Sequence, residues 1–265
     1  MSEIAREPDA PVNLAGAEAL NTEIVPGPPQ RQAIYRALPV VEDWFEMLRA
    51  FCADKPSDHA RAADWILDND YQVKRALRRL SKDLPPQFYD KLPAFAGKKG
   101  AGPPRVYIIA QTVLEQLNAQ IKLASLTEFI AQYQKAAPLG NAELWAMPSF
   151  LRLVCLEQLV YAAADMDPHL ALMQDPGPHT LADTAPVDRI AHAITNLIAI
   201  DSIKWPDFVD HVSCIEAELA NDPEGVYAGM TFETRNRYRR VVEQLAWRSG
   251  KSETEVARAV VDLAR

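Results

Sequence analysis

Helical periodicity constrains the fold of this chain more than any other feature of its sequence. Beyond residue 30, apolar residues recur at spacings of three and four, as in Tyr35, Leu38 and Val41, which is the pattern of an amphipathic helix. RVYII at 105–109 is the only β-like run, and it continues into a helical pattern. The sequence therefore predicts an all-α fold.

Prolines, glycines and polar turns divide this pattern into successive helices. Two caps are specific: Thr231 is placed to cap one helix, and Ser252 with Glu255 three residues later forms a capping box for the last one. The expected helices cover 31–51, 57–80, 105–117, 126–136, 143–164, 188–203 and 205–221, with two more on either side of Ser249-Gly250.

The proline distribution suggests how the helices are grouped. Residues 1–30 are proline-rich with little periodicity, so we expect a disordered tail. Residues 165–187, DMDPHLALMQDPGPHTLADTAPV, read as a linker rich in proline and aspartate. We therefore expect a multi-helix array in two helical lobes, 31–164 and 188–265, joined by this linker.

The bulk composition is that of an ordinary globular protein, and its cysteines indicate a cytoplasmic one. Apolar residues make up 48% and charged residues 24% of the 265 residues. The three cysteines are far apart and odd in number, as expected for reduced thiols. The N-terminus does not resemble a secretory signal, and the apolar run 190–200 is about half the roughly 20 residues that a membrane span needs.

Residue motifs alone assign no reaction to the chain. The signatures of serine hydrolases, zinc proteases and nucleotide-binding loops are absent from the sequence. Two Asp-x-Asp sequences, at 68–70 and 165–167, could hold a divalent metal only at the end of a strand, and we find no sheet. Asp and His residues of the 165–187 segment lack a scaffold to arrange them. We therefore predict no catalytic site, no metal site and no cofactor.

Two basic stretches stand out in a chain whose net charge is -8. Residues 74–105 hold nine basic and two acidic residues, so this segment is either a solvated surface or a contact for an anionic membrane. Residues 231–265 contain four arginines within six residues and match the spacing of a helix-turn-helix. Glu253 and Glu255 would begin its recognition helix, which is unfavourable for binding DNA. We therefore favour packing between helices and expect no nucleic-acid partner.

Four long motifs occur in the order of a known family. They are WILDNDYQVKRALRRLSKDLPPQFYDKLPAF from Trp65, GPPRVYIIAQTVLEQL from Gly102, FIAQYQKAAPLGNAELWAMPSFLRLVCLEQL from Phe129 and DPEGVYAGMTFETRNRYRRVVEQLAWRSGKSETEVARAVVDLA from Asp222. Together they resemble the cyclic β-1,2-glucan synthases of bacterial inner membranes, over most of 63–164 and 203–265. Pro103 departs from the family's usual tyrosine, which weakens a ligand role for its loop.

The resemblance implies a place in a large membrane protein that makes periplasmic cyclic glucans from UDP-glucose. The matching region is the helical part that precedes the catalytic modules, so we expect a non-catalytic scaffold at the inner face of the inner membrane. Its partners would be the catalytic domains of a synthase, in cis or in trans. Alternatives are a module that binds glucan or UDP-glucose, and a DNA-binding protein that uses residues 231–265.

Twelve motif residues are expected to form polar and aromatic contacts between helices. They are Trp65, Asp68, Asn69, Tyr71, Arg105, Tyr107, Glu143, Trp145, Arg152, Tyr227, Arg235 and Tyr238.

Overall fold

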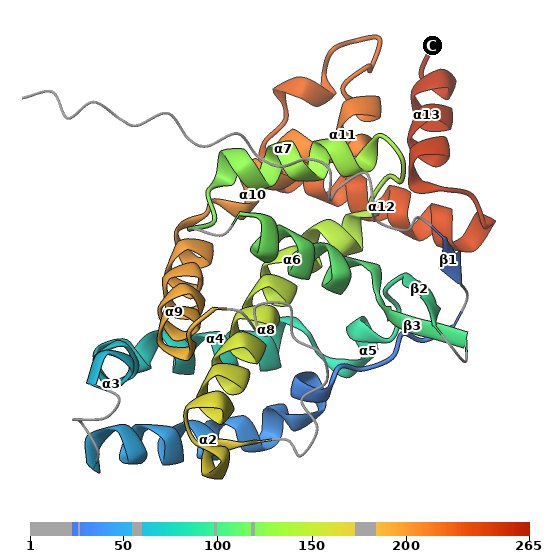
Figure 1. The fold of residues 1–265 in the computed structure, drawn as a ribbon. Helices are drawn as coiled ribbons and strands as arrows, with labels where there is room; N and C mark the ends of the chain where they lie inside the picture. The colour runs from blue at the N-terminus through green and yellow to red at the C-terminus, as the bar shows by residue number, and fades with distance from the viewer. Residues whose placement is uncertain (1–22, 26, 55–59, 98–99, 118–119, 173–183) are drawn as a thin grey trace, which may run out of the picture.

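The structure, a computed structural model, describes residues 23–25, 27–54, 60–97, 100–117, 120–172 and 184–265. Its described part is predominantly helical, which confirms the predicted fold class (Figure 1). The helices are α2 (Ala33–Asp54), α3 (Ala60–Asp68), α4 (Asp70–Asp83), α5 (Pro86–Tyr89), α6 (Arg105–Gln116), α7 (Leu123–Gln134), α8 (Asn141–Met166), α9 (Pro186–Ser202), α10 (Trp205–Val212), α11 (Cys214–Leu219), α12 (Phe232–Ser249) and α13 (Glu253–Leu263). Two short 3-10 helices, η1 (Pro168–Leu170) and η2 (Tyr227–Gly229), complete the helical elements.

The long helix α8 lies at the centre of the molecule, with α2, α4, α6 and α9 packed against it (Figure 1). It begins two residues before the expected start, because the Glu143 carboxylate accepts the Gly140 N–H at 3.0 Å and so caps the first turn. Pro148 therefore lies inside the helix, not in its first turn. Most side chains of α8 are buried, which fits a helix surrounded by others.

A small antiparallel sheet, which we did not expect, lies beside α5 and α6. Its strands are β1 (Ile24–Val25), β2 (Ala94–Gly97) and β3 (Gly100–Pro104), in the order β1-β2-β3. These strands are short and rich in glycine, alanine and proline, so they carry no alternating pattern. A Cβ atom on Gly97 would lie 2.9 Å from Gly102 Cα, so the close approach of β2 and β3 requires glycine there.

Two expected helices are each broken in two. The helix expected over 57–80 divides into α3 and α4 at Asn69, whose side-chain amide donates to the Trp65 carbonyl at 3.0 Å. The helix expected over 205–221 divides into α10 and α11 at Ser213, whose hydroxyl accepts the Glu216 N–H at 3.2 Å. Residue 57, at the start of the first of these expected helices, lies outside the described residues.

Both predicted caps near the C-terminus are confirmed. Thr231 caps α12, and Ser252 with Glu255 forms the capping box of α13. Between these helices, Gly250 adopts a φ of 69° and ends α12 in the left-handed conformation, which glycine adopts without steric cost.

The described buried apolar residues form two clusters. The larger cluster runs from Ile34 to Val212 and includes α9 and α10, and the smaller runs from Ile215 to Val261. The change of cluster thus falls near Ser213, whereas the expected lobe boundary lay at 165–187. The division of the chain into domains stays a prediction.

The structure also differs from the expectation at the two proline-rich segments. Residues 1–22 and 173–183 lie outside the described residues. Ile24 and Val25, at the end of the expected tail, pair with Phe95 and Ala94 of β2. In the expected linker, the Leu170 carbonyl accepts the indole N–H of Trp44 at 2.7 Å, so this part is held against α2.

Candidate functional site: charged contacts between helices

A buried ion pair joins the start of α6 to the first turn of α8. Arg105 follows β3 directly, and its Nε donates to Glu143 Oε1 at 2.7 Å while Nη2 donates to Oε2 and to the Pro138 carbonyl. Side chains of the pair are only 7% and 2% exposed. Burial alone would lower the pKa of the Arg105 guanidinium, but its hydrogen bonds with Glu143 raise the pKa overall.

A second buried contact lies further along the same two helices. The Tyr107 hydroxyl donates to Glu157 Oε2 at 2.8 Å, and both residues are buried. Burial raises the pKa of Glu157 to about 8, although the hydrogen bond from Tyr107 acts in the opposite direction. This carboxyl group therefore titrates near neutral pH while it remains inside the larger core.

Three arginines surround one aspartate where α4, α8 and α9 meet. We call Arg75, Arg79, Arg152 and Asp201 the Asp201 cluster. Arg75 Nε, Arg79 Nη1 and Arg152 Nη2 lie 3.0, 2.9 and 2.8 Å from the Asp201 carboxylate oxygens. Burial lowers the pKa of Arg152, as does the neighbouring charge of Arg79, whereas Asp201 raises it. The cluster thus ties three helices together around a single negative charge.

The smaller core contains a balanced cluster of charges, which we call the Arg239 cluster: Asp210, Glu216, Tyr227, Arg235 and Arg239. Arg239 is fully buried and its Nη1 lies 2.7 Å from Asp210 Oδ1 and 2.6 Å from Glu216 Oε2. Arg235 pairs with the same two acids, and the Tyr227 hydroxyl donates to Glu216 at 2.7 Å. These contacts join α10, α11, η2 and α12.

Polar contacts also join α12 and α13 to the N-terminus of α8. The Asn141 N–H donates to Glu253 Oε2, and the Asn141 side-chain amide donates to Glu243 Oε2, both at 2.8 Å. Burial raises the pKa of Glu253 to about 7. Arg239 and Glu243 are one turn apart on α12 but do not pair with each other, because Arg239 contacts Asp210 and Glu216 while Glu243 contacts Asn141.

The remaining motif residues lie nearer the surface. Trp65 and Trp145 are partly buried and pack on the larger core, and Trp145 also meets the Phe232 ring edge-on at 6.1 Å. Asp68 is exposed, and Tyr71 and Tyr238 are 53% and 45% exposed. On α12, Val242 and Ala246 are buried, whereas Leu245 is 43% exposed, like Tyr238 about two turns earlier.

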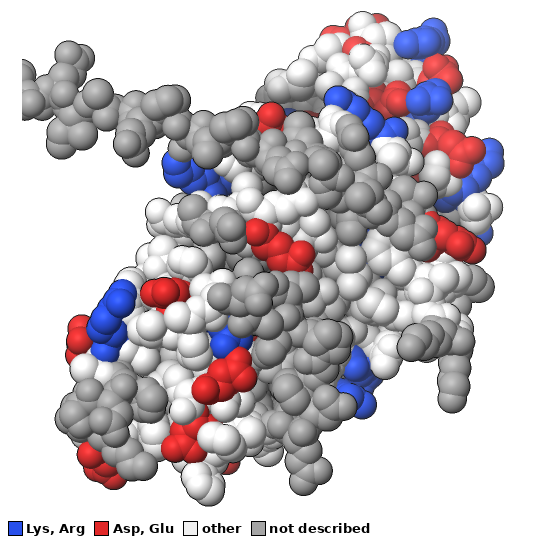
Figure 2. All heavy atoms as spheres, viewed as in Figure 1, with Lys and Arg blue, Asp and Glu red and all other residues white. Residues whose placement is uncertain are grey.

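Much of the charge in the basic segment 74–105 is paired inside the protein. Lys74 lies 2.5 Å from Glu46, and Arg75, Arg79 and Arg105 bind the acids described above. Residues 98 and 99 lie outside the described residues. On the face shown in Figure 2, acidic and basic side chains are interspersed. Membrane contact through this segment stays a prediction.

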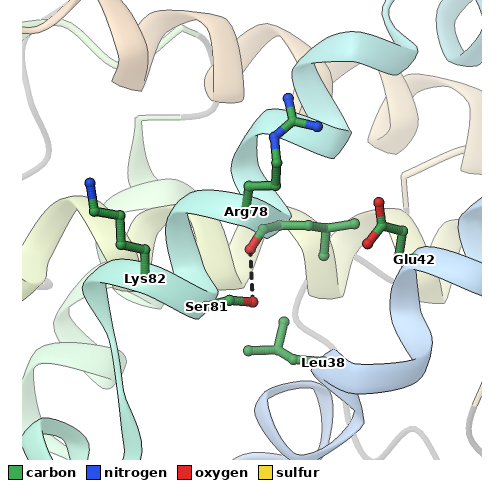
Figure 3. Close-up of a pocket in the computed structure, with 6 residues that line it drawn as sticks. Leu38, Glu42, Arg78, Ser81 and Lys82 are labelled. Carbon is green, nitrogen blue, oxygen red and sulfur yellow. Dashed lines mark hydrogen bonds between the residues drawn. The ribbon is translucent and has the colours of Figure 1, made fainter.

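A groove between α2 and α4 is lined by exposed members of the segment. Its walls are Leu38 and Glu42 from α2 and Leu77, Arg78, Ser81 and Lys82 from α4 (Figure 3). The Ser81 hydroxyl donates to the Leu77 carbonyl at 3.2 Å. The cationic groups of the wall are Arg78 and Lys82. One acid and two bases beside two leucines define no particular chemistry.

The described residues include no group of three or more His, Cys, Asp and Glu side chains placed to hold a metal ion. In this same part of the chain, no helix combines the length and the apolar character that a bilayer span requires.

The α12–α13 pair has a helix-turn-helix order, but the first turn of its second helix is only partly open to solvent. Glu253 in that turn is partly buried against Asn141 of α8. Two of the four clustered arginines, Arg235 and Arg239, are held by acids, and the exposed ones, Arg237 and Arg240, lie on the first helix. This arrangement does not favour insertion of α13 into a DNA groove.

Several residues that complete these contacts were missed from the sequence, namely Asn141, Glu157, Asp201, Asp210, Glu216, Arg239 and Glu253. One signal could have found two of the contacts. Arg152 and Glu157 interrupt the apolar run of α8, and a charge in such a run needs a partner because burial of an unpaired charge is costly. Tyr107, the partner of Glu157, was among the twelve motif residues, whereas Asp201, the partner of Arg152, has no distinguishing feature in the sequence.

Comparison with known proteins gives one distant relationship. The chain is 26% identical to the cyclic β-(1,2)-glucan synthase NdvB of Rhizobium meliloti (strain 1021) over 271 aligned positions, which cover 76% of this chain. The chain spans only 10% of the length of that synthase. No model of a known protein family matches the chain. The similarity supports the expected relationship at a distance and gives no firm family assignment.

Proposed function

We propose that this chain acts in the synthesis of cyclic β-(1,2)-glucan as a non-catalytic helical module that positions the catalytic parts of a synthase. The observation that carries this proposal is the extent of the similarity, 76% of the chain against a tenth of a very long relative. A match that covers most of this chain but only a small part of its relative is what we expect for one module of a larger assembly. We place its work at the inner face of the bacterial inner membrane.

The internal charged contacts support a scaffold role. Arg105, Arg152 and Arg235, which lie in the resembling motifs, each bind an acid on another helix. Their hydrogen bonds hold helices in fixed relative positions, since a guanidinium and a carboxylate pair only in a narrow geometry. A rigid frame of this kind is what a positioning module needs.

Exposed apolar residues on α12 supply a surface for the catalytic parts. Trp247 is 85% exposed, and Val241 and Leu245 are 51% and 43% exposed on the same helix. Val241 and Leu245 are four residues apart and offer one face of the helix as a contact surface between proteins, and Trp247 offers a second contact on another side of the helix. Tryptophan in particular contributes strongly to such interfaces.

Complementation would test this proposal. A cyclic β-(1,2)-glucan synthase that lacks the tenth matched by this chain would be supplied with the chain in trans, and glucan formed from UDP-glucose would be measured. We expect the chain to restore synthesis and Trp247→Ser to reduce the restoration. The control is Val226→Ser, at an exposed valine before η2, which should restore as well as the parent. A folded chain that restores nothing would contradict the proposal.

The alternative of a module that binds UDP-glucose is favoured by one observation, the excess of arginine over aspartate in the Asp201 cluster. Calorimetry of the full chain with UDP-glucose and with glucan would decide it. Heat with UDP-glucose would support this alternative, whereas heat with glucan alone would indicate a sugar site elsewhere.

A further inference from the structure

The Asp201 cluster is less well neutralised than the other charged clusters in the described part of the chain. The Arg239 cluster has two arginines and two acids, and Arg105 has Glu143. At Asp201, three guanidinium groups share one carboxylate. Asp83 is the other acid that acts on Arg152, and its influence is the weakest of those acting there. The cluster therefore carries an excess of positive charge.

The excess positive charge of the Asp201 cluster is buried at Arg152 and partly exposed at Arg75 and Arg79. The Arg152 side chain is only 3% exposed and Asp201 is 13% exposed, whereas Arg75 and Arg79 are 35% and 37% exposed. Arg75 and Arg79 lie one turn apart on α4, so their guanidinium groups reach solvent side by side. An anion can approach these two groups from solvent while Arg152 adds positive charge from beneath.

The pKa of Arg152 shows that Asp201 does not compensate it fully. Burial and the neighbouring Arg79 lower its pKa, although Asp201 lies 2.8 Å away. Arg105 is buried to a similar extent with a carboxylate of its own, and its pKa is raised. Arg105 forms two hydrogen bonds with its carboxylate, whereas Arg152 forms one and shares Asp201 with two other cations.

We propose that Arg75, Arg79 and Arg152 form a binding site for a phosphate-type anion at the junction of α4, α8 and α9. Arg75 Nη1 donates to the Tyr71 hydroxyl at 2.8 Å and Arg79 Nη1 donates to Asp201 at 2.9 Å, so the phosphoryl oxygens would accept hydrogen bonds from the Nη2 atoms of these two arginines. Arg152 and Asp201 would keep their present contact, and their charges would contribute to the electrostatic potential at the bound anion. Inorganic phosphate, a nucleotide and a lipid headgroup share this chemistry, and the test below distinguishes them.

The proposal does not depend on a role in glucan synthesis, so the two can fail separately. The test uses the full chain in calorimetry and thermal unfolding, with inorganic phosphate, UDP and vesicles of phosphatidylglycerol as three separate probes. Sodium chloride at matched ionic strength is the reference. We expect at least one probe to bind and to raise the melting temperature above the chloride reference, and the probe that does so identifies the source of the phosphate.

Adjacent residues on α4 provide a matched pair of variants. Arg79→Gln should weaken binding of the probe by about tenfold, because it removes one charge-assisted hydrogen bond. Arg78→Gln removes the same charge from the neighbouring residue on the groove of Figure 3, and should leave binding unchanged. Asp201→Asn should strengthen binding, because it removes the competing negative charge. The proposal is overturned if no probe binds better than chloride, or if Arg78→Gln weakens binding as much as Arg79→Gln.

Discussion

Removal of the Glu143 carboxylate is the sharpest test of how this fold is held together. Glu143 accepts two hydrogen bonds from Arg105 and one from the Gly140 N–H, and its side chain is 2% exposed. In Glu143→Ala, the Arg105 guanidinium stays buried without a compensating charge. Breaking a buried pair in this way costs about 3–5 kcal/mol of unfolding free energy.

The assay is thermal unfolding of the full chain, followed by circular dichroism. We expect the melting temperature of Glu143→Ala to fall by about 10 °C, since 1 kcal/mol shifts a chain of this size by roughly 2–4 °C. The double variant Arg105→Met with Glu143→Leu should recover much of this loss, because an apolar pair of similar volume leaves no buried charge. Glu218→Ala, which removes the partner of the exposed Arg258, is the surface control and should change little.

Two results would refute this reasoning. One is a Glu143→Ala variant that melts within about 2 °C of the parent, because a shift that small corresponds to no more than about 1 kcal/mol in a chain of this size. The other is a double variant that is less stable than Glu143→Ala, since the charge left on Arg105 would then not be the cause of the loss.

Three further results are expected. Burial raises the pKa of Glu253 from 4.5 to about 7. The stability that its protonated form contributes is therefore complete below pH 4.5 and is lost as pH rises through 7. The melting temperature of the parent should accordingly fall relative to that of Glu253→Gln between about pH 5 and 8. The pKa of Glu157 is raised from 4.5 to about 8, so its contribution to stability should also be lost with rising pH, over a window that extends to higher pH. The melting temperatures of the parent and of Glu157→Gln in the same pH series measure this loss. Gly250→Ala should lower stability by about 1 kcal/mol in urea unfolding, because Gly250 has a φ of 69° that an L-residue adopts at a cost; an unchanged midpoint would contradict this account.

The sequence predicts those parts of this fold that depend on local spacing. Thr231 and Ser252 mark the starts of α12 and α13, since a cap uses only residues within one turn. The strands around Gly97 escaped prediction, because β1 pairs with a segment about 70 residues away and the local hairpin of β2 and β3 has no alternating apolar pattern. The break at Ser213 was missed because the apolar pattern of α10 and α11 continues across it.

The charged contacts show the same limit more clearly. Arg105, Glu143 and Arg152 were selected from the resemblance, but nothing in the sequence showed that Arg105 faces Glu143 or that Arg152 faces Asp201. Those pairings depend on how α6, α8 and α9 pack in space. An isolated charge in an apolar run predicts that a partner exists, whereas only the structure identifies it.

The small size of the second apolar cluster has a consequence for the dynamics of the chain. Only eight buried residues form it, and its attachment to the first turn of α8 includes the hydrogen bonds of Asn141 with Glu243 and Glu253. A segment with few apolar contacts opens at a lower free energy than the rest of a protein. In native-state hydrogen exchange, we therefore expect the amides of α11, α12 and α13 to exchange together and well before those of α8. The C-terminal segment from α11 to α13 would then behave as a separate cooperative unit, able to detach and return while the larger core stays folded.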